Sequence, residues 1–136
     1  MGVAYHAHYL VWFELGRTEL MREAGCPYGE LEEREGIRFP VIEAGARYLS
    51  PARYDDLLTV RTRITRYTRA RIRFDYRLTC PSPGESAAAA RKTLSARDHR
   101  TLATGFTVHA AVGRDGRAMR MPKGLMRKLE SWERLA

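Results

Sequence analysis

Two tyrosines and two histidines gather within the first nine residues, at Tyr5, His6, His8 and Tyr9. The apolar pattern predicts a helix over 9–24, so these four side chains lie where that helix begins. A helix start offers free backbone N–H groups and a positive partial charge, which can bind an anion or stabilise a developing oxyanion. An imidazole titrates near neutral pH, so His6 or His8 could also act as a base. The alternative is that Tyr5 and His6 only cap and pack the helix.

A metal site is not expected from these histidines. His6 and His8 stand two apart, with no Cys, Asp or Glu at matching spacing nearby. The two cysteines, Cys26 and Cys80, are too few for a disulfide framework and lack metal-ligand spacing. We therefore expect neither a metal nor a cofactor, and a reduced, cytoplasmic setting. No apolar run approaches the ~20 residues that span a bilayer, and the start of the chain does not read as a secretory signal.

The chain is strongly basic. It holds 24 Lys and Arg residues against 16 Asp and Glu, for a formal net charge of +8. Lysine occurs only at Lys92, Lys123 and Lys128, so the other 21 basic residues are arginines. A basic excess favours anionic partners, and arginine favours bidentate contacts with phosphate. The alternative is that the arginines reflect composition and only keep the chain in solution.

The length and the helical segments suggest a single unit. At 136 residues the chain fits one domain, 1–136. The helix over 9–24 is apolar nearly all round in its first half, which predicts burial on most sides. A short helix is expected over 27–34, closed by Gly36, and a last helix over 123–134.

From Gly36 onward the apolar period changes from helical to two, which is typical of strands. Strands are expected over 37–49, 57–67, 70–78 and 101–112, while residues 85–97 fit either a helix or a hairpin tip. In the third strand the alternation places Ala70, Ile72, Phe74, Tyr76 and Leu78 inward and Arg71, Arg73 and Arg77 outward. One helix followed by long antiparallel strands predicts an α+β architecture in which the sheet curls around the helix.

The sequence from Gly2 to Tyr9, followed by Trp12-Phe13-Glu14 and Arg17, resembles the signature of the hotdog-fold acyl-CoA thioesterases. It is most similar to the 4-hydroxybenzoyl-CoA thioesterase group, which includes the Tol-Pal-associated acyl-CoA thioesterases. Further similar segments are Phe39–Glu43, Tyr48–Asp56, Ala103–His109 and Met121-Pro122. Together the likeness covers residues 2–80 and about 101–130. The resemblance implies the hotdog fold, an antiparallel sheet wrapped around one long central helix.

The resemblance also implies a reaction and a site. A thioester carbonyl would lie at the start of the central helix and be polarised by the backbone N–H of His6, and hydrolysis would give a free acid and coenzyme A. The catalytic candidates are Tyr5 and His6, and the substrate-binding candidates are Tyr9 and the turn residues Ser50, Pro51, Ala52 and Arg53. Arg53 would meet a phosphate of coenzyme A or lie in solvent. The family assembles this site between subunits, so the expected partners are an acyl-CoA and further copies of the chain, in a homodimer or homotetramer.

One part of the family pattern lies outside the sequence. The catalytic aspartate of the family stands seven residues before the position of His6, which is ahead of Met1. Glu14 does not replace it, because two helical turns set it ~10 Å further along the axis. We therefore expect the 136-residue chain to bind acyl-CoA but to turn it over slowly.

Two other functions stay open. A hotdog protein without the aspartate could bind acyl-CoA without catalysis. A basic domain could bind RNA through outward arginines and through Tyr67 and Tyr76, but the aromatic side chains mostly fall on the inward face, which disfavours a stacking surface. We expect no nucleic-acid partner. A solvated role is favoured for the outward arginines of the strands, which are Arg61, Arg63, Arg71, Arg73 and Arg77.

Overall fold

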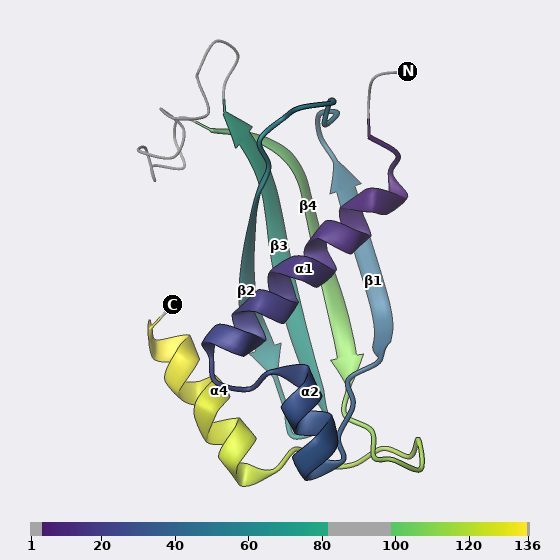
Figure 1. The fold of residues 1–136 in the computed structure, drawn as a ribbon, viewed down its shortest axis with the longest axis vertical. Coiled ribbons are helices and arrows are strands. Elements are labelled where there is room, and N and C mark those ends of the chain that lie inside the picture. The colour runs from purple at the N-terminus through teal and green to yellow at the C-terminus, as the bar shows by residue number, and fades with distance from the viewer. Residues whose placement is uncertain (1–3, 82–98, 136) are drawn as a thin grey trace.

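In the computed structural model, which describes residues 4–81 and 99–135, one long helix lies across a four-stranded antiparallel sheet (Figure 1). The helices are α1 (Ala7–Glu23), α2 (Tyr28–Glu30), its π-helical continuation η1 (Leu31–Glu35) and α4 (Lys123–Leu135). The strands are β1 (Val41–Tyr48), β2 (Thr59–Tyr67), β3 (Arg71–Pro81) and β4 (His99–Ala110), in the spatial order β1-β4-β3-β2. The α+β prediction is confirmed, and residues 85–97 lie outside the described residues.

Strand β3 supplies much of the apolar surface on which α1 packs, and Val60 of β2 also lies against the helix, at Gly16. Ile72, Phe74, Tyr76 and Leu78 are all buried. The ring of Phe13 on α1 stacks on that of Tyr76, with the two centroids 4.6 Å apart. The inward half of the predicted alternation is therefore confirmed for these four residues.

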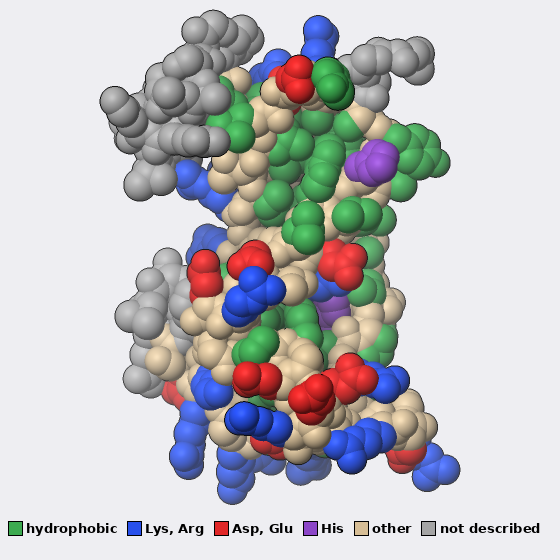
Figure 2. Space-filling view, viewed as in Figure 1, with side chains coloured by type: hydrophobic (Ala, Val, Ile, Leu, Met, Phe, Trp, Pro, Cys, Tyr) green, Lys and Arg blue, Asp and Glu red, His purple; other side chains and the backbone are tan. Residues whose placement is uncertain are grey.

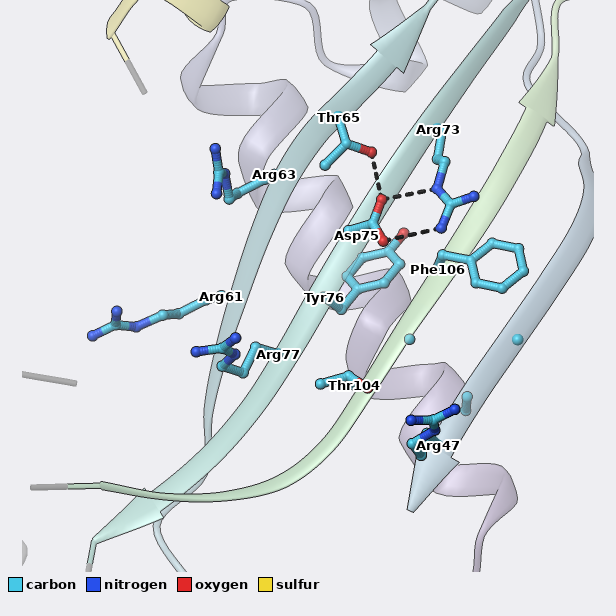
Figure 3. A pocket seen from close by; sticks show the side chains of 13 residues that line it. Arg47, Arg61, Arg63, Thr65, Arg73, Asp75, Tyr76, Arg77, Thr104 and Phe106 are labelled. Atoms are coloured by element: carbon cyan, nitrogen blue, oxygen red, sulfur yellow. Dashed lines mark hydrogen bonds and ion pairs between the residues drawn. The ribbon is translucent and has the colours of Figure 1, made fainter. Parts of the chain in front are cut away.

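The arginines of β3 project from the other face of the sheet, as predicted. Arg73 and Arg77 stand with Arg63 of β2 on the side away from α1 (Figure 3). Ala70 was the one wrong assignment in this strand. It precedes β3, in the turn that follows β2, and it is exposed.

The prediction that α1 is buried on most sides is wrong. The side toward the sheet is buried, but Leu10, Val11 and Leu15 are exposed by 42%, 51% and 60%. Apolar residues all around a helix predict that every side is buried, but they do not identify the element that buries each side. The sheet covers only one side of α1. Figure 2 shows hydrophobic side chains gathered over the region where α1 crosses the sheet. Within the described residues, α1 thus keeps an apolar strip without cover.

Strand β1 starts later than predicted, at Val41, and forms an edge of the sheet. Pro40 precedes it and has no N–H to give to a neighbouring strand, while its carbonyl accepts the N–H of Ala110 at 3.2 Å. The register against β4 shifts between Val41 and Glu43, which leaves a bulge at Ile42. Among the described strands β1 pairs only with β4, and nearly all of its residues are exposed.

Gly105 on β4 allows α1 to approach the sheet closely. A methyl group on its Cα would collide with the ring of Phe13 and would stand 2.8 Å from the carbonyl oxygen of Gly45. We predict that Gly105→Ala lowers the free energy of unfolding by about 1–3 kcal/mol, the usual cost of overpacking a core. Urea unfolding measures this, with Gly124→Ala on α4 as the control because position 124 has open space around it. Equal losses in the two variants would contradict the prediction.

Candidate active site

The start of α1 is joined to the turn that follows β1. The hydroxyl oxygen of Tyr9 accepts the backbone N–H of Ala52 at 3.0 Å. The carbonyl of Ala52 in turn accepts the N–H of Ala4 at 2.8 Å. Both Tyr9 and Ala52 are buried. Tyr9 and Ala52, two of the predicted substrate-binding residues, are therefore in contact at the helix start, and Ala52 contributes its backbone N–H to that contact.

The other residues of this turn lie nearer to the surface. The N–H of Ser50 donates to the carbonyl of Leu102 on β4 at 3.1 Å, which fixes the turn to the sheet. Pro51 and Arg53 are exposed. The backbone N–H of Arg53 donates to Oδ2 of Asp56 at 2.7 Å, so the turn is closed by a carboxylate. The guanidinium of Arg53 is left in reach of solvent, beside the buried part of the site.

Tyr5 and His6, the predicted catalytic residues, lie at the surface around the first turn of α1. Tyr5 is 62% exposed, and its ring centroid is 4.3 Å from that of His6. His6 is the N-cap residue of α1, but its imidazole makes no capping hydrogen bond. The ring of His8 stacks on that of Trp12 one turn further on, with centroids 6.3 Å apart. Side-chain capping by His6, one of the two interpretations of this cluster, is therefore wrong.

The backbone at this helix start has donors to offer. The N–H groups of His8 and Tyr9 donate to the carbonyls of Tyr5 and His6, at 3.0 and 3.3 Å. Within the described part of the chain, the N–H groups of His6 and Ala7 have no backbone acceptor, and no acidic residue stands in the first turn. No acidic side chain of the first turn therefore neutralises the positive end of the helix dipole. This suits a carbonyl oxygen that gains negative charge during a reaction.

Tyr48, the last residue of β1, belongs to the site although it was not in the predicted set. Its hydroxyl donates to the carbonyl oxygen of His6 at 3.1 Å. Its ring packs edge-on against that of Tyr9, with centroids 4.9 Å apart. The signal in the sequence was its place at the end of an alternating strand, just before the turn at Ser50. Tyr48 connects the edge of the sheet to the helix start.

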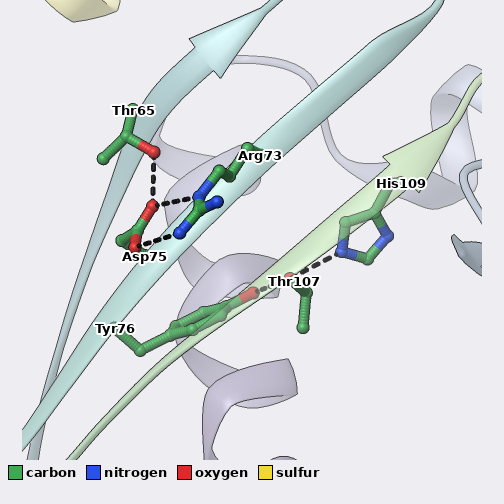
Figure 4. A network of polar contacts seen from close by, with 6 residues as sticks. All are labelled: Thr65, Arg73, Asp75, Tyr76, Thr107 and His109. Carbon is green, nitrogen blue, oxygen red and sulfur yellow. Dashed lines mark hydrogen bonds and ion pairs between the residues drawn. The ribbon is translucent and has the colours of Figure 1, made fainter. Parts of the chain in front are cut away.

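A second polar cluster lies buried where the sheet meets α1 (Figure 4). The hydroxyl oxygens of Tyr76 and Thr107 are 2.6 Å apart, and Oγ1 of Thr107 is 2.8 Å from Nε2 of His109. Nδ1 of His109 is 2.9 Å from the carbonyl oxygen of Phe39. Because a carbonyl only accepts, we assign the proton to Nδ1, so that Nε2 accepts from Thr107 and Thr107 accepts from Tyr76. The network thus holds His109 as one neutral tautomer.

This buried imidazole gives the stability of the fold a pH dependence. Burial lowers the pKa of His109 below its ordinary value near 6.5, and Arg17 acts in the same direction, while the hydrogen bond to Phe39 opposes them. The unfolded chain therefore takes up this proton at a higher pH than the folded chain does. We predict full stability above about pH 6.5 and a falling free energy of unfolding below it, by about 1.4 kcal/mol for each unit between the two pKa values.

Urea unfolding from about pH 8 to about pH 5 measures this dependence. His109→Gln should flatten the curve, and His8→Gln, at an exposed position on α1, is the matched control for replacing a histidine with glutamine. If His109→Gln keeps the slope of the unmodified chain, another group is responsible.

Neither a metal cluster nor a membrane-spanning helix occurs in the described part of the chain. No group of three or more His, Cys, Asp or Glu side chains there could hold a metal ion. No helix there is long and apolar enough to cross a membrane. Cys26 and Cys80 are both free and buried.

Comparison with known sequences assigns a family to these features. Residues 1–87 match the family model described as thioesterase superfamily. The acyl-CoA thioesterase YbgC of Haemophilus influenzae is 39% identical over 77 residues, which are 57% of this chain and 57% of YbgC. YneP of Bacillus subtilis is 35% identical over 82 residues, 60% of this chain and 59% of YneP. The matched segments therefore span less than two thirds of the length of these curated relatives.

Solved structures have the same fold. Protein TT1821 of Thermus thermophilus superposes with a TM-score of 0.78 at 33% sequence identity, covering 96% of this chain and 87% of that one. The 4-hydroxybenzoyl-CoA thioesterase of Pseudomonas sp. strain CBS-3 gives a TM-score of 0.77 at 19% identity, covering 93% and 86%. The fold is thus the hotdog fold that the sequence resembles. The family model also matches more than half of the residues of this chain, so the chain belongs to the thioesterase superfamily.

Proposed function

We propose that the protein hydrolyses acyl-CoA thioesters at the N-terminal end of α1, releasing a free acid and coenzyme A. The observation that carries this proposal is the start of α1, which has no acidic residue in its first turn and is bonded to the Ala52 turn through Tyr9 and Ala4. The relative YbgC of Haemophilus influenzae, named an acyl-CoA thioesterase, supports thioester hydrolysis as the reaction.

In this mechanism the carbonyl oxygen of the thioester accepts the N–H of His6. The helix dipole stabilises the negative charge that grows on that oxygen when the carbonyl carbon is attacked. Water attacks the carbonyl carbon; where the aspartate that the resemblance implies is present, that carboxylate would activate the water or attack first. The C–S bond breaks, and coenzyme A leaves as a thiolate that takes up a proton. No metal and no cofactor takes part.

Two tyrosines hold this arrangement in place. Tyr9 fixes the turn through the N–H of Ala52, and Tyr48 fixes the helix start through the carbonyl of His6. Both tyrosines act as positioning residues, because they contact the backbone that faces the substrate. The exposed guanidinium of Arg53 is placed to pair with a phosphate of coenzyme A.

We propose that the active form is a homodimer or a homotetramer. The apolar strip on α1 is exposed and consists of Leu10, Val11 and Leu15. Two apolar side chains at the start of β1, Val41 and Ile42, are also about half exposed. Among the described strands, β1 also has a neighbour on one side only, and an uncovered edge favours pairing with another strand. A second copy that covers the strip and the edge removes both exposures. Sedimentation should show a dimer or a larger species, and a stable monomer at micromolar concentration would contradict a shared active site.

The test of the reaction is thiol release from acetyl-, benzoyl- and palmitoyl-CoA. Acyl-CoA binding is measured in parallel by calorimetry. We expect measurable turnover of at least one thioester, with coenzyme A and the free acid formed in equal amounts. Binding without any turnover would replace the hydrolase with an acyl-CoA-binding protein, the alternative function, and absence of both would overturn the proposal.

A further inference from the structure

The face of the sheet away from α1 carries a groove of about 760 Å³ that all four strands line (Figure 3). Five arginines line it, which are Arg47 from β1, Arg61 and Arg63 from β2, and Arg73 and Arg77 from β3. Among the described residues that line it, Asp75 is the one carboxylate. The groove therefore has a large excess of positive charge.

The strand register sets like charges opposite one another. Arg61 on β2 is the direct partner of Arg77 on β3, and Arg63 is the partner of Asp75. Thr104 on β4 is the register partner of both Arg77 and Arg47. Like charges directly opposite in an antiparallel pair destabilise a sheet. A bound anion would remove this repulsion.

Asp75 is bonded chiefly to Arg73 within the groove. Its Oδ2 accepts from Nε of Arg73 at 2.9 Å and from the hydroxyl of Thr65, and its Oδ1 accepts from Nη2 of Arg73 at 3.2 Å. Partial burial opposes ionisation, but these hydrogen bonds hold the pKa of Asp75 below its ordinary value. The carboxylate is thus charged, bonds to Arg73 and also attracts Arg63. One carboxylate cannot neutralise both guanidinium groups, and Arg77 has Arg61 opposite it instead of an acidic residue.

The groove offers little to the bases of a nucleic acid. The ring of Phe106 lies so close to Gly45 that a methyl group on that glycine would collide with it. The guanidinium of Arg73 stacks on the same ring, 4.3 Å from its centroid. Tyr76, the other aromatic residue among the described lining, is buried. A stacking surface for bases is therefore lacking among these residues.

A second copy of the chain is also a poor occupant. Across a two-fold axis the same patch meets itself, so the arginines of one groove would face those of the other. The repulsion already present between Arg61 and Arg77 would then be increased.

A short anion with closely spaced charges fits this array better. Neighbouring strands lie about 4.8 Å apart, and residues two apart on one strand are separated by about 6.8 Å, so the arginine charges repeat at short intervals. Linked phosphates also carry their charges at short intervals, and each can accept a bidentate pair of hydrogen bonds from a guanidinium. We propose that the groove binds a short chain of linked phosphates, at a site separate from the acyl-CoA site on the other face of the sheet.

Calorimetric titration with inorganic tripolyphosphate tests this proposal. We expect one tripolyphosphate per chain, with an affinity that falls as salt is added. The variant R63Q/R77Q should lose at least about tenfold in affinity for each arginine removed. The matched control R120Q/R127Q carries the same change of charge on the exposed C-terminal segment outside the groove, and it should bind like the unmodified chain.

Thermal unfolding gives an independent readout. Tripolyphosphate should raise the Tm of the unmodified chain and of the control, but not that of R63Q/R77Q. Without the anion, R63Q/R77Q should be at least as stable as the unmodified chain, because two like charges are gone. If that variant does not fold, R63K/R77K keeps the charge and loses the bidentate geometry, and a weaker affinity for tripolyphosphate is expected of it.

Four results would overturn the proposal. The first is an unchanged affinity for tripolyphosphate in the groove variants. The second is a rise of KM for acyl-CoA in R63Q/R77Q, which would make the groove part of the acyl-CoA site. The third is binding of single-stranded RNA in the absence of tripolyphosphate binding. The fourth is loss of the oligomer in R63Q/R77Q, which would make this face an interface between copies. Because tripolyphosphate binding is measured without turnover, its outcome is independent of the proposed hydrolysis.

Discussion

Replacing His6 with proline is expected to lower kcat for thioester hydrolysis by about 10²- to 10³-fold. Proline has no backbone N–H, and its fixed φ of about −65° fits the φ of −57° at His6. The substitution therefore removes the proposed oxyanion donor while the helix start can keep its backbone conformation. Initial rates of thiol release from the best of the three acyl-CoA substrates measure the effect.

His6→Ala is the matched control, because it removes the imidazole and keeps the N–H. We expect this variant to retain most of the turnover, and circular dichroism should show the same helix content in both variants. If the alanine variant loses as much activity as the proline variant, the imidazole carries the chemistry and the backbone donor does not.

An N-terminal extension that supplies an aspartate seven residues before His6 is expected to raise turnover by about 10²- to 10⁴-fold over that of the 136-residue chain. The resemblance to the hotdog thioesterases implies that an aspartate at that position acts as the nucleophile or the general base. KM should change little, because the contact between Tyr9 and Ala52 is already in place. Steady-state kinetics of the two chains, measured side by side, check both expectations.

The same extension with asparagine in place of aspartate separates the carboxylate from the added length. We expect the asparagine chain to stay as slow as the 136-residue chain. Equal rates in the short and extended chains would show that the aspartate is irrelevant. A residue already present, first of all His6, would then have to carry the reaction.

The sequence predicted burial correctly for residues whose packing partners belong to the same chain. Ile72, Phe74 and Tyr76 face α1 as expected, because a strand with two neighbours must bury one whole face to form a core. At Leu10 and Leu15 the same reasoning failed. An apolar residue predicts that something covers it, but the type of the residue does not show whether the same chain does so.

The location of the site could be predicted, but its internal connections could not. Tyr9 and Ala52 were both expected to bind substrate, yet they meet through a hydroxyl and a backbone N–H that are 43 residues apart. Thr107 and His109 gave no comparable signal, and Tyr48 gave only its place at the end of a strand, before the turn at Ser50. Their partners are backbone carbonyls and residues on other elements, which local spacing along a sequence does not reveal.

The contact of Phe106 with Gly45 also restricts how this sheet can change during evolution. A side chain at position 45 would occupy space that the ring fills, since an added Cβ would stand 3.0 Å from Cζ of Phe106. A descendant that gains a side chain at 45 must therefore give up the large ring at 106. With the ring goes the surface on which Arg73 stacks. A change at position 45 is thus coupled by packing to position 106, and through the ring at 106 it also alters the surroundings of Arg73.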